Sequence, residues 1–151
     1  MALVPGFTAT TRLTADQTGS ISIVEHVFSP GSLVPPHRHT REDEISYVVN
    51  GAIGFRSDGR EVSIAAGGYI VKPRGELHSM WNAGSVPARM IEIISPAGFE
   101  QYFVALAEAV AVAGRRPDPA VLGPIAERYG LTFDFDEVPD LVARHGLTPP
   151  R

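Results

Sequence analysis

Short segments in which β-branched and polar residues alternate, each followed by a turn signal, occupy the first two thirds of the chain. The clearest covers residues 20–28 (SISIVEHVF) and stops at Ser29-Pro30-Gly31. The same pattern predicts further strands over residues 45–49, 52–55, 61–64, 69–72, 77–81 and 88–94. Strands that recur every eight to twelve residues or so are typical of a sandwich or barrel.

Two of these strands are predicted to form a hairpin. Residues 45–49 (ISYVV) run into Asn50-Gly51, and the strand over residues 52–55 follows at once. Asn-Gly between two alternating segments is the strongest short-range hairpin signal, so we expect these strands to pair with each other.

The pattern changes at Ser95-Pro96-Ala97-Gly98. Helices are predicted over residues 99–113, 119–129 and 138–145, each closed by a glycine. Because the helices follow the strands, we expect an all-β class, with a β-sandwich or barrel over residues 1–97 and a C-terminal helical extension over residues 98–151 packed on the same domain.

The first predicted helix carries one apolar stripe. Its members recur at three- and four-residue spacing: Phe99, Tyr102, Phe103, Leu106 and Val110. We expect this stripe to pack on the outer face of the barrel, or on a partner's barrel in a dimer. The alternative is that it covers the barrel mouth as a lid.

Composition excludes several classes of protein. The chain has 151 residues and a net charge of −4 without a dense basic run, so we expect no nucleic-acid partner. It has no cysteine, which removes disulfides, thiolate metal sites and cysteine nucleophiles and fits a reducing compartment. No segment resembles a signal peptide or approaches the roughly 20 apolar residues of a membrane span. We therefore expect a cytoplasmic protein with no membrane partner.

The candidate functional residues are found mainly around the histidines. His37 and His39 are two residues apart, so both imidazoles project from the same face of an extended strand and can share one metal ion. A carboxylate on the returning segment would complete the set; Glu44 is one candidate, with Glu42 and Asp43 as alternatives. A His-x-His pair alone is weak evidence, because single strand histidines are more often surface or core residues.

Two windows of the sequence resemble the two motifs of the cupin family. The first, G-x5-H-x-H-x4-E-x6-G, falls on Gly31, His37, His39, Glu44 and Gly51. The second, G-x5-P-x-G-x2-H-x3-N, falls on Gly67, Pro73, Gly75, His78 and Asn82. The resemblance covers about residues 20–96 and implies a double-stranded β-helix, the jelly-roll cupin barrel. It also implies that His37, His39, Glu44 and His78 are metal ligands, and the family spacing favours Glu44 over its two neighbours.

The resemblance implies one divalent transition metal per chain, with iron, manganese, nickel, copper, cobalt and zinc all compatible with the donor set. Our leading hypothesis is a dioxygenase-like oxygenase acting on an enolic, catecholic or flavonol-type small molecule. The alternatives are a non-redox isomerase, lyase or polyketide cyclase, and a cupin that only binds a small ligand, because a cupin fold does not fix a reaction.

Two further expectations concern residues outside the motifs. Alternation places His26 on the same strand face as Val24 and Phe28 and Glu25 on the opposite face, so only one of the two can line the cavity. We favour His26 as a catalytic acid or base, and the alternative is that it is a surface histidine. Tyr47, Tyr69 and Trp81 would suit the interface of a homodimer, which is the expected assembly.

Overall fold

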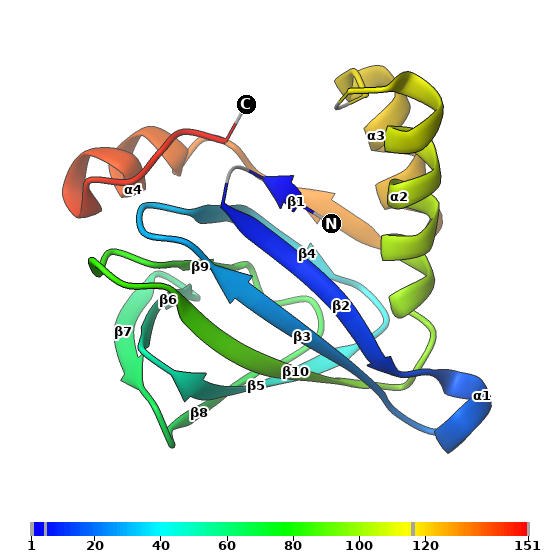
Figure 1. Cartoon of the computed structure of the whole chain (residues 1–151), viewed down its shortest axis with the longest axis horizontal. Helices are drawn as coiled ribbons and strands as arrows, with labels where there is room; N and C mark the ends of the chain where they lie inside the picture. Colours follow the sequence, from blue (N-terminus) through cyan, green and yellow to red (C-terminus); the bar gives the residue numbers. More distant parts are fainter. Residues whose placement is uncertain (1, 5, 116, 151) are drawn as a thin grey trace.

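The computed structural model describes residues 2–4, 6–115 and 117–150. Two antiparallel sheets form a jelly-roll barrel, and most of the helical structure follows it in the chain (Figure 1). The predicted fold class, an all-β barrel with C-terminal helices, is thereby confirmed. None of the described helices is long and apolar enough to cross a membrane.

The larger sheet has six strands. In spatial order they are β1 (Ala2–Val4), β2 (Phe7–Leu13), β3 (Ser22–Phe28), β10 (Ala88–Ser95), β5 (Asp43–Asn50) and β8 (Tyr69–Lys72). The smaller sheet has five, in the order β11 (Leu131–Phe133), β4 (Leu33–His39), β9 (His78–Trp81), β6 (Ala52–Ser57) and β7 (Arg60–Ala65). The helices are α1 (Ala15–Thr18), α2 (Glu100–Ala113), α3 (Pro119–Arg128) and α4 (Val138–His145).

Alternation along the strands builds the core of the barrel. On β3 every second residue is buried, including Val24, His26 and Phe28. The main hydrophobic cluster draws on both sheets and contains Phe7, Phe28, Val48, Ile53, Phe55, Met80, Ala88 and Met90. Inward-facing residues of the two sheets therefore fill the barrel except at the end that holds the histidines.

The hairpin predicted at Asn50-Gly51 is wrong. β5 pairs with β10 and β8, whereas β6 pairs with β7 and β9 in the other sheet. The chain passes from one sheet to the other at Gly51, which has φ of 73°; a Cβ there would lie 2.9 Å from the Cβ of Ala88. Both the backbone conformation and this close approach require glycine, so the turn signal was correct and the inferred pairing was not.

Several strands and one helix were not predicted from the sequence. β1, β2 and α1 precede the first predicted strand, and β11 lies inside the segment predicted to be helical. β11 pairs with β4, placing Phe133 opposite His37 and Leu131 opposite His39. The C-terminal extension therefore contributes a strand to the sheet that carries three of the histidines, next to the strand that carries His37 and His39.

The apolar stripe of α2 does not pack on the outer face of the barrel. Phe99, Tyr102, Phe103, Leu106 and Val110 line a cavity together with barrel residues, and α2 contacts α3 and β3. Figure 1 shows α2 and α3 side by side along one side of the barrel. The outer-face prediction is wrong and its alternative, a cover over the barrel mouth, describes the structure, because periodicity identifies a buried face without identifying what buries it.

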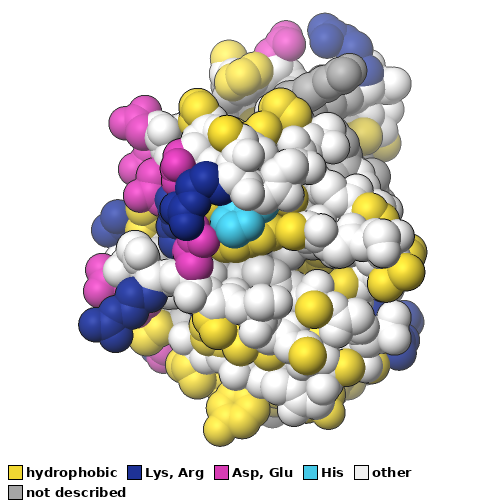
Figure 2. All heavy atoms as spheres, turned by 90° about the vertical axis from the view of Figure 1, so that its left-hand side faces the viewer, with side chains coloured by type: hydrophobic (Ala, Val, Ile, Leu, Met, Phe, Trp, Pro, Cys, Tyr) yellow, Lys and Arg dark blue, Asp and Glu magenta, His cyan; other side chains and the backbone are white. Residues whose placement is uncertain are grey.

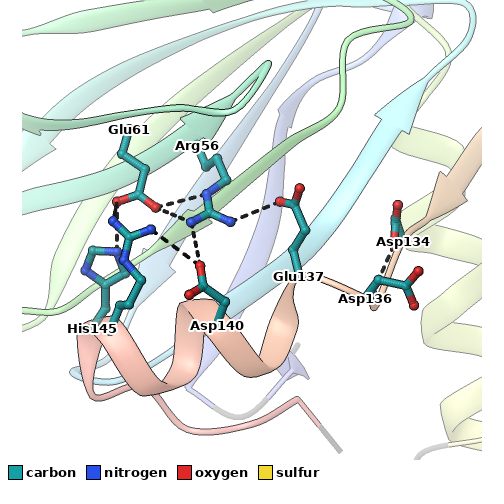
Figure 3. Close-up of polar contacts among 8 residues, drawn as sticks. Arg56, Glu61, Asp134, Asp136, Glu137, Asp140 and His145 are labelled. Atoms are coloured by element: carbon teal, nitrogen blue, oxygen red, sulfur yellow. Dashed lines mark hydrogen bonds and ion pairs between the residues drawn. The ribbon is translucent and has the colours of Figure 1, made fainter.

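α4 is held against the smaller sheet by charged groups. Figure 2 shows basic and acidic side chains gathered around a histidine on the left-hand face of Figure 1. Arg56 of β6 donates hydrogen bonds to Glu61, Glu137 and Asp140, and His145 lies 3.1 Å from Glu61 (Figure 3). Beneath this network Trp81 is buried against apolar residues of α4 and its flank, so Trp81 is not available for a dimer interface.

Candidate metal centre

Three strands from both sheets bring the predicted ligand residues together. His37 and His39 come from β4, and the pairing of β4 with β9 sets His37 opposite His78. Glu44 comes from β5 in the other sheet, where alternation buries Glu44, Ser46 and Val48 on the inner face. The cluster therefore spans the space between the two sheets.

The four side chains meet at one point. One ligand atom from each of His37, His39, Glu44 and His78 lies within 4.8 Å of the others, and all four residues are buried. Nε2 of His39 is 3.4 Å from one carboxylate oxygen of Glu44, and Nε2 of His78 is 3.2 Å from the other.

Backbone carbonyls fix the orientation of two imidazoles. Nδ1 of His37 lies 2.8 Å from the carbonyl oxygen of Pro35, and Nδ1 of His78 lies 3.0 Å from that of Glu76. Each Nδ1–H can donate to its carbonyl, which leaves the Nε2 lone pairs for the cluster. Nε2 of His78 is buried and has no hydrogen-bond partner among the described groups. The Nε2 lone pairs and the Glu44 carboxylate therefore converge on one point, and no hydrogen-bond donor of the described residues lies between them. This arrangement fits a cation, so the residues suit a divalent metal ion.

The surroundings of His37, Glu44 and His78 favour the protonation states that bind a metal. Burial, together with the neighbouring His78 and His39, holds the pKa of His37 well below its ordinary value. Burial also lowers the pKa of His78. Burial alone would raise the pKa of Glu44, but electrostatic interactions with His39 and Lys72 outweigh it and hold that pKa well below its ordinary value. Neutral imidazoles and an ionised carboxylate are the states that bind metals.

The two alternative carboxylates, those of Glu42 and Asp43, lie outside the cluster. Glu42 is buried on the far side of His39, with its carboxylate 3.7 Å from Nδ1 of that ring. Asp43 faces Arg74, at 2.8 Å. Neither residue joins the cluster.

Sequence reasoning missed a buried charged network beside the cluster. Nζ of Lys72 lies 3.0 Å from Glu44 and 2.8 Å from Glu92, and Glu92 accepts a hydrogen bond from Ser46. Lys72 is the only lysine in the chain. A signal was available: alternation puts Lys72 in phase with the inward-facing Ile70, and Glu92 in phase with Met90 and Ile94.

A cavity of about 750 Å³ opens next to the cluster. His37, His39 and Glu44 lie in its wall, as does His26, the predicted acid or base. His26 is buried, its ring stacks on Phe7 at 4.8 Å, and its Nδ1 has no hydrogen-bond partner among the described groups. Burial and the charge of Lys72 lower the pKa of His26 to about 4, so its imidazole is neutral at pH 7.

The chain resembles known proteins over its barrel. The cupin domain family matches residues 24–94. Germin-like protein 9-3 of Oryza sativa subsp. japonica is 31% identical over 137 residues, covering 87% of this chain and 59% of the relative. The tetracenomycin polyketide synthase protein TcmJ of Streptomyces glaucescens is 34% identical over 86 residues, covering 56% of this chain and 58% of the relative. The chain thus spans less than two thirds of the length of these curated relatives.

A solved structure has the same barrel. It is described as a predicted oxalate decarboxylase from Thermotoga maritima and superposes with a TM-score of 0.57 at 25% identity, covering 64% of this chain and 89% of that one. The family match, the two-sheet barrel and the His–Glu cluster agree with one another. Residues 24–94 of the chain therefore form a cupin domain.

Proposed function

We propose that this protein is a metal-dependent oxygenase that acts on a small molecule with adjacent enolic or catecholic oxygens. The observation that carries the proposal is the position of the cluster: three of its four residues form part of the wall of a cavity large enough for a substrate. A structural metal site would be closed off by its ligands, whereas a cavity beside the donors leaves room for a chelating substrate.

A bound divalent transition metal would supply Lewis acidity and, where it is redox-active, a route for electrons to dioxygen. In the proposed reaction dioxygen is the oxidant, the substrate is oxidised, and both oxygen atoms enter the product. His37, His39, Glu44 and His78 are the residues that would hold the metal.

The remaining residues have positioning and proton-transfer roles in this proposal. Lys72 fixes the carboxylate of Glu44 from behind. His26, neutral and unpaired at Nδ1, is placed to accept the proton of a substrate hydroxyl when a substrate occupies the cavity. Phe99, which immediately precedes α2, makes a T-shaped contact with the ring of His39 at 4.3 Å between centroids, so it helps to exclude water from the cluster.

The similarity to a polyketide synthase protein favours a second candidate, a non-redox cyclase, isomerase or lyase that uses the same donors. The similarity to a predicted oxalate decarboxylase from Thermotoga maritima adds oxalate to the ligands that should be tested. A cupin that binds a small ligand without turnover is the third possibility.

Oxygen-electrode measurements distinguish these candidates. Protein loaded separately with iron, manganese, nickel, copper, cobalt or zinc is tested with a flavonol, a catechol, a β-dicarbonyl compound and oxalate. Metal-dependent oxygen uptake that disappears in the His37→Ala/His39→Ala variant supports the oxygenase. Metal-dependent turnover of any of these compounds without oxygen uptake replaces it with the non-redox candidate, and saturable binding without turnover replaces it with the binding protein.

A further inference from the structure

The cavity has two ends of different chemistry. Phe99, at the start of α2, touches the ring of His39, and Val110 lies on the same cavity-lining face of the helix. Eleven residues at about 1.5 Å each separate the two positions by roughly 16 Å. The cavity therefore extends from the His–Glu cluster along α2, away from the barrel.

We call the end formed by the two helices the helical subsite. Its walls are the cavity-lining residues toward the end of α2 and along one face of α3: Leu106, Val110, Pro119, Leu122, Gly123, Ala126 and Glu127. All except Glu127 are apolar or lack a side chain, and Glu127 is exposed. Spacing by three and four residues along α3 makes this wall a continuous helix face.

The charges in the cavity wall restrict the ligand. Among the described lining residues there is no lysine or arginine, and the charged ones are Glu44, Glu92 and Glu127. A phosphate or carboxylate on the body of a ligand would lose its hydration without gaining a cationic partner. The cavity therefore disfavours an anionic body, and the apolar walls of the helical subsite suit an uncharged one.

Gly123 gives the subsite its depth. It lies inside α3, where glycine costs about 1 kcal/mol relative to alanine. It has no positive φ that would demand glycine, and a Cβ built there meets no atom within 4 Å beyond its chain neighbours, of which the next is Pro124. A larger residue at this position in the cavity wall would extend into open space.

We infer that the helical subsite binds the uncharged, apolar ring system or chain of a substrate whose oxygens face the His–Glu cluster, and that Gly123 sets how large that body can be. The apolar body of the ligand is inferred from the cavity walls alone. The inference that the ligand also carries chelating oxygens rests on the proposed function.

A metal-free experiment tests the subsite by itself. The neutral fluorescent probe N-phenyl-1-naphthylamine is titrated into wild-type protein and into Gly123→Ala and Gly123→Phe in the presence of a chelator. We expect Gly123→Phe to weaken binding at least about tenfold, because its ring removes apolar contacts from the probe. Val112→Phe, on the solvent-exposed side of α2, is the matched control and should bind as the wild type does.

A second experiment tests the orientation of the ligand in metal-loaded protein. Tropolone and 3-hydroxyflavone both chelate through neighbouring oxygens, but only the flavone carries an additional phenyl body. Calorimetry should show that Gly123→Phe weakens the flavone at least about tenfold and leaves tropolone within about twofold of the wild type, because only the flavone reaches the helical subsite.

The outcomes separate the two proposals. Unchanged binding of both the naphthylamine and the flavone in Gly123→Phe overturns the helical subsite, as does equal loss of tropolone and flavone in a variant that keeps the wild-type circular dichroism spectrum. If tropolone fails to bind the metal-loaded wild type while the naphthylamine result holds, the subsite stands and the proposed function fails. Gly123→Ala adds only a methyl group before Pro124 and carries the test if the phenylalanine variant does not fold: a smaller loss in the same direction supports the subsite, and no loss overturns it.

Discussion

Nζ of Lys72 lies 3.0 Å from the carboxylate of Glu44, and both side chains are buried. The same ammonium group lies 2.8 Å from Glu92, so one cation serves two buried carboxylates. Burial alone would lower the pKa of Lys72, but Glu44 and Glu92 outweigh it and raise that pKa. Burial raises the pKa of Glu92 to about 7, since a single lysine does not fully compensate both acids. The only lysine of the chain thus supports the ligand carboxylate.

Replacing Lys72 tests this support. Lys72→Met should lower the free energy of unfolding of the metal-free protein by about 3 to 5 kcal/mol, because it leaves a buried carboxylate without its cation. Urea denaturation in a chelator measures the loss. Lys72→Met/Glu92→Gln, which also removes one acid, should recover part of it.

Metal should compensate for the missing ammonium group. Addition of a divalent ion is expected to raise the melting temperature of Lys72→Met more than that of the wild type, because the ion brings positive charge to Glu44. An equal or smaller rise in the variant would mean that Lys72 does not serve Glu44.

The metal ligands are tested by removing two of them. His37→Ala/His39→Ala should abolish the bound divalent metal, about one per chain, as measured by elemental analysis after purification. The barrel has its own apolar core, so the circular dichroism spectrum should remain that of a folded protein. The control His145→Ala, outside the cluster, should keep its metal. Full metal content in the double variant would contradict the assignment.

His26 makes stability depend on pH. Its folded-state pKa is about 4 against an ordinary value of 6.5, so below pH 6.5 the unfolded state binds a proton that the folded state excludes. This contribution is complete above pH 6.5 and is lost as the pH falls toward 4. Between pH 7 and 5 the wild type should lose about 2 kcal/mol more than His26→Phe.

Denaturation of both metal-free proteins at the two pH values isolates the His26 contribution, because the other buried histidines are common to both. Parallel losses in the two proteins would place a charged, solvated His26 in the folded state and remove the basis for its proposed role.

The sequence allowed the barrel to be predicted to the extent that burial follows strand alternation. β3 shows this best, since its inward residues match the predicted face that carries His26. β11 was missed because its pairing with β4 depends on tertiary contacts that three residues cannot encode. The surface that buries the apolar stripe of α2 was predicted wrongly for a related reason. The local sequence shows that Leu106 must be buried, but it does not identify the surface that covers it.

The ligand cluster was more predictable than its surroundings. His37 and His39 share a strand face by spacing alone, while Glu44 and His78 needed the motif to join them. Lys72 and Glu92 could have been noticed as charged residues in phase with apolar ones, but their mutual contact depends on β5 lying between β8 and β10.

The cytoplasmic location stays a prediction.

Arg56 is expected to determine how firmly α4 is attached. Its guanidinium group bonds to Glu137 and Asp140 at the start of α4, so Arg56→Met should cost about 1 to 3 kcal/mol and speed hydrogen exchange over residues 138–145. Arg144→Met, whose side chain is about half exposed, is the control and should change stability by less than about 0.5 kcal/mol. Unchanged exchange in Arg56→Met would show that apolar packing alone holds α4.

The homodimer expected from the sequence stays a prediction, and the structure indicates which surface should be tested as its interface. Tyr47 pairs with Tyr69 and Ile45 with Val71 across β5 and β8, and all four side chains are exposed on the outside of the barrel. Burying such a surface in a second copy would be favourable by about 25 cal/mol per Å². If these residues form the interface, Tyr69→Asp should shift the protein from dimer to monomer in analytical ultracentrifugation, whereas Val112→Asp on the exposed side of α2 should not. A monomeric wild type, or a Tyr69→Asp variant that remains dimeric, would exclude this surface.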